Sequence, residues 1–356
     1  MRVPYADLEA ALHRGVLHLG LKGERAALCA RLFAETTRDG VYTHGLNRFP
    51  RFTQWIANGS IDVDAQAEPI AGAGTAVLER WNGHRGPGNI NAYAAMQRAI
   101  AMAKQHGMGA VAMANTNHWM RGGSYGWLAA EAGVFALCWT NTMPNLPAWG
   151  ATNAVLGNNP LILAVPRNGA VLEGGTTTRD GGPIVLDMAM SQFSYGALAG
   201  YARRDEPLPV VGGYDPAGNL TTDAAAIEAS QRALPIGYWK GSGLSMMLDL
   251  FAAMLSGGIA THQIPADPAL EAGVSQFFLC IDPGSLSSPE ELDRVAGGIL
   301  ASVHAAHPVD PAKPVRYPGE QTLQLREENL RLGVPVDPDL WRRLCEFPDT
   351  ASRLIP

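Results

Sequence analysis

The chain of 356 residues is 47% hydrophobic and 17% charged, with a formal net charge of −6 at pH 7. That length supports a sizeable core with two or three lobes, and the negative charge argues against nucleic acid or an anionic membrane surface as a partner. The four cysteines lie far apart without a CxxC pair, so we expect buried free thiols in a reducing compartment. Because the first residues, MRVPYADLEAAL, contain no apolar signal core, we expect a cytoplasmic protein.

Hydrophobic periodicity predicts helices and strands along most of the chain. Apolar residues recur every three or four positions between 6 and 37, which predicts two helices with ends near Gly20 and Gly40. Residues 59–81 predict a turn-rich connection followed by a strand. Further helices are predicted over 91–107, 126–133, 243–258, 289–306 and 328–347, and buried strands over 109–116, 134–141, 161–166, 184–191 and 274–282.

Strands that alternate with helices in the middle of the chain, between helical ends, predict an α/β fold. We divide the chain into a helical region, residues 1–75 plus 310–356, and a middle domain, residues 76–309. Residues 168–182, NGAVLEGGTTTRDGG, contain mostly turn-forming residues and predict a surface hairpin or loop.

No charged residue and no histidine occurs between Glu131 and Arg167, yet asparagines recur there among prolines and glycines. Such a run belongs in the interior or at an interface, and its polar residues, prolines and glycines exclude a membrane span. One interpretation is a pocket whose amides hydrogen-bond a polar ligand. The other is a set of loop and turn asparagines beside ordinary core strands. The asparagines are Asn141, Asn145, Asn153, Asn158 and Asn159.

Several long motifs follow one another along the chain: GVYTHGLNRFPRF (40–52), NHWMRGGSYGW (117–127), WTN (139–141), PAWG (147–150), GNNP (157–160), LDMAMSQFSYG (186–196), LPIGYWKGSG (234–243) and RYPGE (316–320). In these motifs the chain resembles the malate/L-lactate dehydrogenase-type family of NAD(P)-dependent oxidoreductases. The resemblance implies a sulfolactate dehydrogenase-like α/β fold, in which a non-Rossmann NAD(P)-binding mixed-sheet domain is flanked by helical N- and C-terminal segments. It assigns nicotinamide binding to residues 76–309 and substrate binding and dimerisation to residues 1–75 plus 310–356. Residues 168–182 are an insertion relative to the family pattern.

Reduction of an oxo acid by a nicotinamide requires a proton donor for the developing alkoxide and a clamp for the carboxylate. Histidine suits the first role because its pKa lies near working pH, and the planar fork of arginine suits the second. His44 and Arg48 share one face if residues 43–48 are helical; alternatively Pro50 begins a new helix and these residues form an approach loop. The spacing alone is common, but the resemblance makes His44 the proton donor and places Arg48 beside it. Thr43 stands where the family usually has serine, so hydroxyl support for His44 is retained.

His118 lies at the end of a predicted strand, before a tryptophan and a pair of glycines. A lone histidine there is ordinarily a core residue with satisfied hydrogen bonds. The resemblance places it in the active site, as a substrate contact or a second acid–base group. The neighbouring glycines would let the backbone approach a ligand closely.

The chain contains no G-x-G-x-x-G, P-loop or H-E-x-x-H motif, so local fingerprints predict no nicotinamide site. The resemblance nevertheless implies three cofactor-binding segments. Asp187 would accept a hydrogen bond from a ribose hydroxyl, and Lys240 would meet the pyrophosphate. Without the resemblance these segments indicate a core strand, a surface lysine and an ordinary turn. The implied cofactor residues are Pro183, Ile184, Val185, Leu186, Asp187, Met188, Ala189, Trp239, Lys240, Gly319, Glu320 and Gln321.

The resemblance implies a homodimeric reductase of a 2-oxo sugar acid, with 2,3-diketo-L-gulonate as the most specific expectation and 3-dehydro-L-gulonate as product. NADH is the expected cofactor, with NADPH as the alternative. Other expected activities of the family are oxidation of malate, lactate, sulfolactate or ureidoglycolate, and reduction of cyclic imino acids. A different class would be a metal-dependent hydrolase or lyase using His44, His118 and Asp187, but their spacing resembles no metal site, so we expect none.

Overall fold

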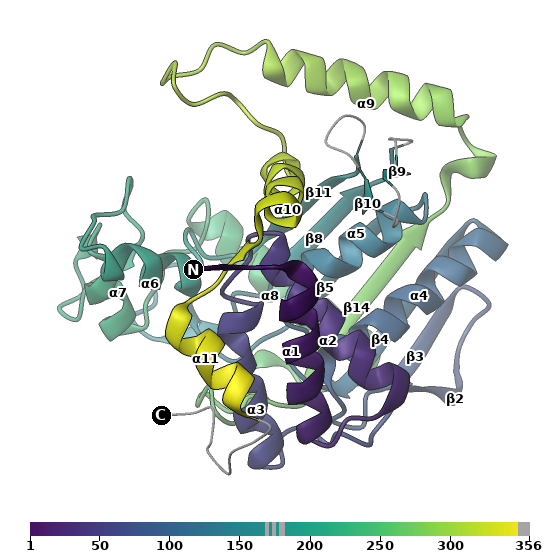
Figure 1. Cartoon of the computed structure of the whole chain (residues 1–356), viewed down its shortest axis with the longest axis horizontal. Helices are drawn as coiled ribbons and strands as arrows, with labels where there is room; N and C mark the ends of the chain where they lie inside the picture. Colours follow the sequence, from purple (N-terminus) through teal and green to yellow (C-terminus); the bar gives the residue numbers. More distant parts are fainter. Residues whose placement is uncertain (168–170, 173–175, 178–181, 348–356) are drawn as a thin grey trace.

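The protein folds around a seven-stranded sheet with helices on both faces (Figure 1). The computed structural model describes residues 1–167, 171–172, 176–177 and 182–347. Helices from the two ends of the chain pack together beside the sheet. The predicted α/β class, with a mixed sheet and helical ends, is therefore confirmed.

The strand order of the sheet is β11-β8-β5-β14-β4-β3-β2. Only β3 and β4 are parallel neighbours, and every other pair is antiparallel, unlike the parallel sheet of a Rossmann domain. Successive residues of β4 point to opposite faces: Val111 and Met113 join one core, while Ala110 and Ala112 join the other. The strands are β2 (Glu68–Gly74), β3 (Leu78–Asn82), β4 (Met108–Thr116), β5 (Phe135–Thr140), β8 (Leu161–Val165), β11 (Ile184–Met188) and β14 (Val274–Ile281).

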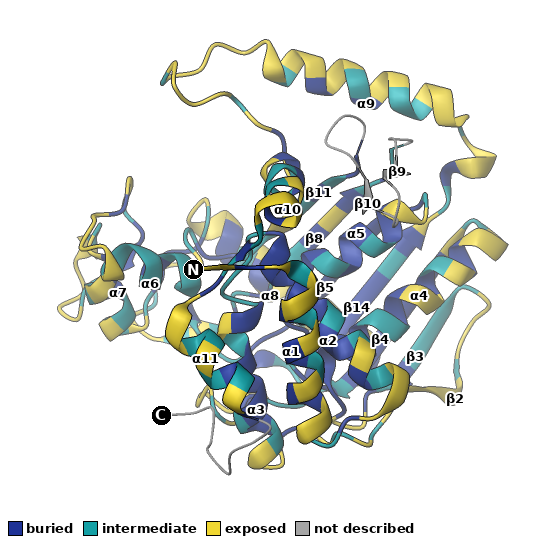
Figure 2. Ribbon diagram, in the orientation of Figure 1, coloured by how far each residue is buried: buried dark blue, intermediate teal, exposed yellow. Residues whose placement is uncertain are grey.

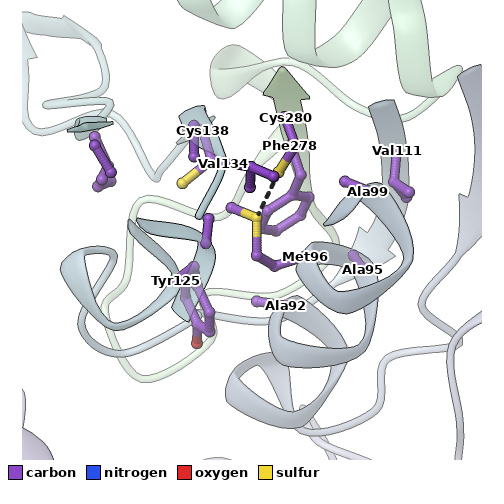
Figure 3. Close-up of a cluster of buried hydrophobic side chains, with 14 of the residues drawn as sticks. Ala92, Ala95, Met96, Ala99, Val111, Tyr125, Val134, Cys138, Phe278 and Cys280 are labelled. Carbon is purple, nitrogen blue, oxygen red and sulfur yellow. Dashed lines mark hydrogen bonds between the residues drawn. The ribbon is translucent and has the colours of Figure 1, made fainter. Parts of the chain in front are cut away.

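Two helices, α4 (Gly88–His106) and α5 (Gly123–Glu131), cover one face of the sheet, and α8 (Trp239–Ser256) packs on the other. Figure 3 shows the core under α4, where Met96 meets Phe278 and Cys280 of β14. The sulfur atoms of Met96 and Cys280 lie 3.4 Å apart. Helix α4 ends at Gly107, whose φ of 85° is a left-handed conformation that favours glycine.

A second core joins the two ends of the chain. Helices α1 (Tyr5–His18), α2 (Gly23–Arg38), α3 (Phe49–Ala57) and α11 (Pro338–Glu346) bury Leu12, Phe33, Phe49 and Trp55 between them. Burying one large apolar side chain contributes about 1.5–3 kcal/mol. Strand β1 (Arg2–Val3) also pairs with β15 (Val334–Pro335). The assignment of this region to substrate binding and dimerisation, and of 76–309 to the cofactor, remains a prediction.

The remaining elements connect these layers. Helix α9 stands away from the sheet at the top of Figure 1, and Figure 2 shows that most of its surface is exposed. The other helices are α6 (Tyr195–Arg203), α7 (Ala224–Ser230), α9 (Pro289–His304) and α10 (Glu320–Leu332), with 3-10 turns η1 (Leu46–Arg48), η2 (Thr261–Gln263) and η3 (Pro283–Ser285). Short strand pairs are β6 (Leu146–Pro147) with β7 (Ala154–Leu156), β9 (Val171–Leu172) with β10 (Thr176–Thr177), and β12 (Gly213–Tyr214) with β13 (Leu220–Thr221).

Most predicted elements are present, but the C-terminal helix prediction is wrong in part. Residues 328–347 form two helices, because Gly333 has a φ of 87° and the following two residues pair with β1. Two strands, β2 and β3, occupy the stretch for which one was predicted. The predicted hairpin or loop at 168–182 lies mostly outside the described residues. Of its described residues, those of β9 pair with those of β10.

The four cysteines are free, as predicted; three are buried, whereas Cys345 is half-buried. Across the described ranges, no helix combines the length and apolar character needed to cross a bilayer.

Candidate active site

A cavity of about 380 Å³ lies where the terminal helices meet β11, within the size range of ligand pockets. Two of the three predicted catalytic residues, His44 and His118, line it. Five of the predicted cofactor residues lie on the same wall: Val185, Leu186, Asp187, Ala189 and Gly319. The fold thus brings residues from distant parts of the chain to one site.

His44 lies in a turn that precedes η1 and α3. Pro50 stands in the first turn of α3, so a new helix begins there as the second alternative has it. The approach segment is a loop only in part, because Leu46–Arg48 form the 3-10 turn η1. The backbone N–H of Leu46 donates to the Thr37 hydroxyl at 2.9 Å and ties this turn to α2. Thr43 Oγ1 lies 3.0 Å from Nδ1 of His44, which leaves Nε2 as the nitrogen free to meet a substrate.

His118 follows the end of β4 and stacks between two other rings. Its ring centroid lies 5.6 Å from that of Trp55 and 5.7 Å from that of His44. The backbone N–H of Met120 donates to Nδ1 of His118 at 3.0 Å. Because Nδ1 accepts this bond, the neutral ring carries its proton on Nε2 and is a hydrogen-bond donor there.

Both histidines have pKa values below the ordinary range. Burial, followed by the charges of Arg48 and Arg121, lowers the pKa of His44 to about 3. Burial, Arg48 and His44 lower the pKa of His118 well below its usual value. In the protein alone both rings are therefore neutral near pH 7. The choice of histidine as proton donor assumes a pKa near working pH, whereas burial and the nearby cations hold both pKa values below that range in the protein alone.

Arg48 does not line the cavity. Its Nε donates to the carbonyl of Thr43 at 3.2 Å, which holds the side chain behind the His44 turn. Glu271, which is buried and does line the cavity, accepts from the backbone N–H of Met143 at 3.2 Å. Burial raises the pKa of Glu271, while the Met143 N–H, Arg48 and Arg51 oppose that rise.

The cofactor segments divide into wall residues and outlying residues. Oδ2 of Asp187 accepts from the backbone N–H of Gly123 at 2.8 Å. Gly319 has a φ of 90°, and a Cβ there would lie 3.1 Å from the backbone nitrogen of Val185, so only glycine fits this close approach. Small residues at 122, 123 and 319 with an acceptor at 187 fit a flat cofactor ring and a ribose hydroxyl against β11.

The outlying residues are placed differently. Trp239 and Lys240 are exposed at the start of α8, and Gln321 is exposed on α10. Glu320 is buried, and its Oε2 accepts from the backbone N–H of Tyr317 at 3.3 Å and lies 3.0 Å from Nε2 of His304. Pro183, Ile184 and Met188 flank the wall residues of β11 without lining the cavity.

The asparagine-rich run serves mainly to brace loops. The amide of Asn141 donates to Asp249 at 2.9 Å and accepts from the backbone N–H of Ser275 at 2.7 Å. The amide of Asn159 likewise donates to the Ser245 carbonyl at 2.9 Å. Each interpretation therefore holds in part. Most hydrogen bonds of these asparagines brace loops, and Asn141 and Asn158 also line the cavity.

Two charged residues of the cavity lining, Arg121 and Glu271, were not predicted as site residues from the sequence. Arg121 is the only charged residue between Asn115 and Glu131, and that isolation within the NHWMRGGSYGW motif was a usable signal. Glu271 follows a loop of ordinary composition and gave no such signal. Its place is decided by tertiary packing.

The alternative metal-dependent class finds no site in the described part of the chain, where no three His, Cys, Asp or Glu side chains come together as metal ligands.

Known proteins share this architecture. The chain is 42% identical over 345 residues to a 2,3-diketo-L-gulonate reductase of Shigella boydii serotype 4 (strain Sb227), covering 97% of this chain and 99% of that one. The chain is 43% identical, with the same coverage of both chains, to a protein of that name from Escherichia coli (strain SMS-3-5).

Solved structures agree with this relationship. The malate dehydrogenase of Pyrococcus horikoshii OT3 has a TM-score of 0.84 at 26% identity, covering 98% of this chain and 95% of that one. The sulfolactate dehydrogenase of Methanocaldococcus jannaschii has a TM-score of 0.86 at 24% identity, covering 98% and 97%, and it confirms the predicted fold. The family model described as malate/L-lactate dehydrogenase matches residues 3–345. The chain is an oxidoreductase that belongs to the malate/L-lactate dehydrogenase family.

Proposed function

We propose that the protein reduces a 2-oxo sugar acid with NADH, and that its substrate is 2,3-diketo-L-gulonate, reduced to 3-dehydro-L-gulonate. One observation carries the proposal: His44 and His118 share a single cavity with the β11 residues and Gly319. The name of the relatives at 42% identity supports the choice of substrate. The test is a panel of 2-oxo acids, cyclic imino acids and their reduced forms, assayed with NADH and with NADPH. If kcat/KM is higher for malate, lactate, sulfolactate, ureidoglycolate or an imino acid, that compound replaces the sugar acid as the proposed substrate.

The predicted site residues have distinct roles in this proposal. A nicotinamide cofactor would supply the hydride, and the β11 residues with Gly319 would hold it. His44 delivers the proton from Nε2, because Thr43 occupies the side of Nδ1. His118 donates a hydrogen bond from Nε2 to a substrate oxygen, since Met120 fixes its tautomer. Trp239, Lys240 and Gln321 remain predicted contacts for the outer part of the dinucleotide.

The charge of the substrate prepares His44 for this step. Arg48 and Arg121 both lower the pKa of His44 in the protein alone. A substrate carboxylate bound in the cavity would offset these cations. The pKa of His44 then rises, and the ring takes up the proton that it later delivers.

Because Arg48 donates to the Thr43 carbonyl and does not line the cavity, its predicted role as the carboxylate clamp requires its side chain to turn toward the cavity when the oxo acid binds. Arg48→Lys should then chiefly raise KM for the oxo acid, because lysine keeps the charge but loses the planar fork. Arg48→Ala should raise KM further, with kcat less affected in both variants. Steady-state kinetics on the preferred substrate measures this split. An unchanged KM in Arg48→Ala would remove Arg48 from the substrate site.

The protein should prefer NADH over NADPH. The 2′-phosphate of NADPH is carried by the adenosine ribose, and Asp187, beside the N-terminus of α5, would repel that phosphate if the adenosine ribose lies next to it. The ratio of kcat/KM for the two cofactors measures the preference. Asp187→Asn, which removes the charge and keeps the size, should narrow that ratio. A clear NADPH preference in the wild-type protein contradicts the assignment.

The active unit should be a homodimer. Helix α8 exposes a row of large apolar side chains, more than a monomer surface ordinarily carries. Met254 is 71% exposed and Phe251 is 49% exposed. Light scattering should report a dimer, and Met254→Glu should shift it towards monomer. Ile70→Glu, at an exposed apolar residue on β2, is the matched control. An active wild-type monomer at assay concentration would overturn the expectation. The cytoplasmic location remains a prediction, and none of these measurements depends on it.

A further inference from the structure

One arginine on the cavity wall has a donor that no protein atom satisfies. Arg121 lies in the turn between β4 and α5, is 5% exposed, and lines the cavity that contains His44. Its Nη1 donates to Asp39 at 2.7 Å. Its Nε is buried and makes no hydrogen bond within the described part of the chain. Buried polar atoms in native proteins are nearly always paired, so this donor calls for a ligand oxygen or a water molecule.

Asp187 offers an acceptor next to that donor. A Cβ on Gly123 would lie 2.7 Å from Oδ2 of Asp187 and 3.3 Å from Nε of Arg121, so both groups surround one point at the start of α5. Among the described residues, Asp187 accepts its hydrogen bond from the backbone N–H of Gly123. Asp187 and Arg121 form no ion pair with each other in that part of the chain. Although part of the Asp187 side chain is open, the protein packed around it raises its pKa, while Arg121 opposes the rise. A hydroxyl group suits this pair, because it donates to a carboxylate and accepts from a guanidinium at once.

The guanidinium of Arg121 is held in place from the side away from the cavity. Asp39, at the end of α2, is 2% exposed and accepts from three arginines. Arg326 of α10 donates to both of its carboxylate oxygens, at 3.0 and 2.8 Å. Arg326 also lies 4.7 Å from the ring centroid of Trp127, another wall residue. The arrangement fixes Arg121 through bonds from helices at the two ends of the chain.

We propose that Arg121 donates a hydrogen bond to a hydroxyl or carbonyl oxygen of the molecule bound in this cavity, and that Asp39 and Arg326 are positioning residues that hold its guanidinium there. The proposal rests on the proposed function. Two bound molecules would carry such an oxygen: the sugar acid, in the hydroxylated chain beyond its keto group, and the cofactor, in its ribose. The two sources have the same chemistry at Arg121 and are separated by the measurements below.

Arg121→Met removes the donors and the charge while it keeps an unbranched side chain. Arg38→Met is the matched control, because Arg38 also donates to Asp39, at 2.8 Å, but does not line the cavity. Each variant takes one arginine from the same carboxylate. Both are assayed with 2,3-diketo-L-gulonate and with pyruvate, which has no hydroxylated chain, and both are titrated with NADH by fluorescence. Arg121→Lys, which keeps the charge, serves if Arg121→Met fails to fold by circular dichroism.

If the oxygen belongs to the sugar acid, Arg121→Met lowers kcat/KM for 2,3-diketo-L-gulonate roughly 10- to 100-fold, the scale of one lost bond to a charged donor. Its kcat/KM for pyruvate and its Kd for NADH then change less than about threefold on the same scale. If the oxygen belongs to the ribose, Kd for NADH rises by the larger factor instead. In either case Arg121→Met raises the pKa of His44, measured by NMR, because one nearby cation is gone. Arg38→Met leaves these quantities near wild type.

The proposal is overturned if Arg121→Met keeps wild-type kcat/KM for both acids and wild-type Kd for NADH. It is also overturned if Arg38→Met shows the same losses, since loosening of the Asp39 network would then explain both. A different result overturns only the proposed substrate: wild-type protein that ignores 2,3-diketo-L-gulonate but reduces another acid of the panel. The comparison of the two variants is then made on that acid and on NADH binding, so the two failures are distinguishable.

Discussion

Replacing His44 by alanine should lower kcat for the reduction by about 10²–10⁴-fold, the usual scale for losing a general acid. Thr43 occupies Nδ1 of His44 and leaves Nε2 as the other ring nitrogen, and His44 lines the same cavity as the β11 residues. Binding of NADH, followed by fluorescence, should change little. His118→Ala is the comparison variant, and it should mainly raise KM, because His118 is assigned a hydrogen bond to substrate. Near wild-type kcat in His44→Ala together with loss of turnover in His118→Ala would mean that the proton comes from the other histidine.

The pH dependence should separate the free protein from its substrate complex. The free-enzyme pKa governs kcat/KM, and the pKa in the complex governs kcat. Because the pKa of His44 is about 3 in the protein alone, kcat/KM for reduction should fall about tenfold per pH unit above about pH 4. The substrate carboxylate raises this pKa, so kcat should remain level to a higher pH before it falls. Only the His44→Ala variant should lose both the fall of kcat/KM and the fall of kcat with rising pH.

Replacing Asp39 by asparagine should lower the free energy of unfolding by about 3–5 kcal/mol, the scale for breaking a buried ion pair from one side. The substitution keeps the shape but leaves three arginines around a neutral amide, two of them buried nearly as deeply as Asp39. Urea denaturation at fixed protein concentration measures the change, since association would otherwise contribute. Asp339→Asn, which breaks an exposed pair with Arg342 on α11, is the matched control and should change little. Equal stability of the two variants would contradict the role given to Asp39.

The contribution of Asp39 should also disappear in acid. Burial raises the pKa of this carboxyl, but Arg326, Arg121 and Arg38 outweigh burial and hold the pKa well below its ordinary range. A group whose pKa is lower in the folded than in the unfolded state stabilises the fold above its unfolded pKa, about 3.9 for aspartate. That stabilisation declines as pH falls below this value. The wild-type protein should therefore lose stability more steeply below about pH 4 than Asp39→Asn does.

The sequence by itself determined the elements whose signals are local. The periodicity of residues 91–107 and the apolar run of 274–282 predicted α4 and β14, because a helix face and a buried strand each leave a pattern within a few residues. Long motifs also determined the family, and they located His44 and His118 before any contact was known. Gly333 is also visible in the sequence, but a glycine alone does not show that a helix is interrupted. The interruption depends on the positive φ of Gly333 and on the pairing of the next two residues with β1, which lies more than 300 residues away in the chain.

Only the tertiary structure decided how the cavity is charged. Asp39, Arg121 and Arg326 lie far apart in the chain and meet because α2, the β4–α5 turn and α10 pack together. The pKa of His44 depends on the same assembly, since burial and charges from other segments set it. The structure also leaves Arg48 out of the cavity lining and places Trp239 and Lys240 at an exposed helix start, distinctions that family motifs do not carry. Electrostatic interactions act through space, so their strength follows from distance and burial in the fold and not from spacing along the chain.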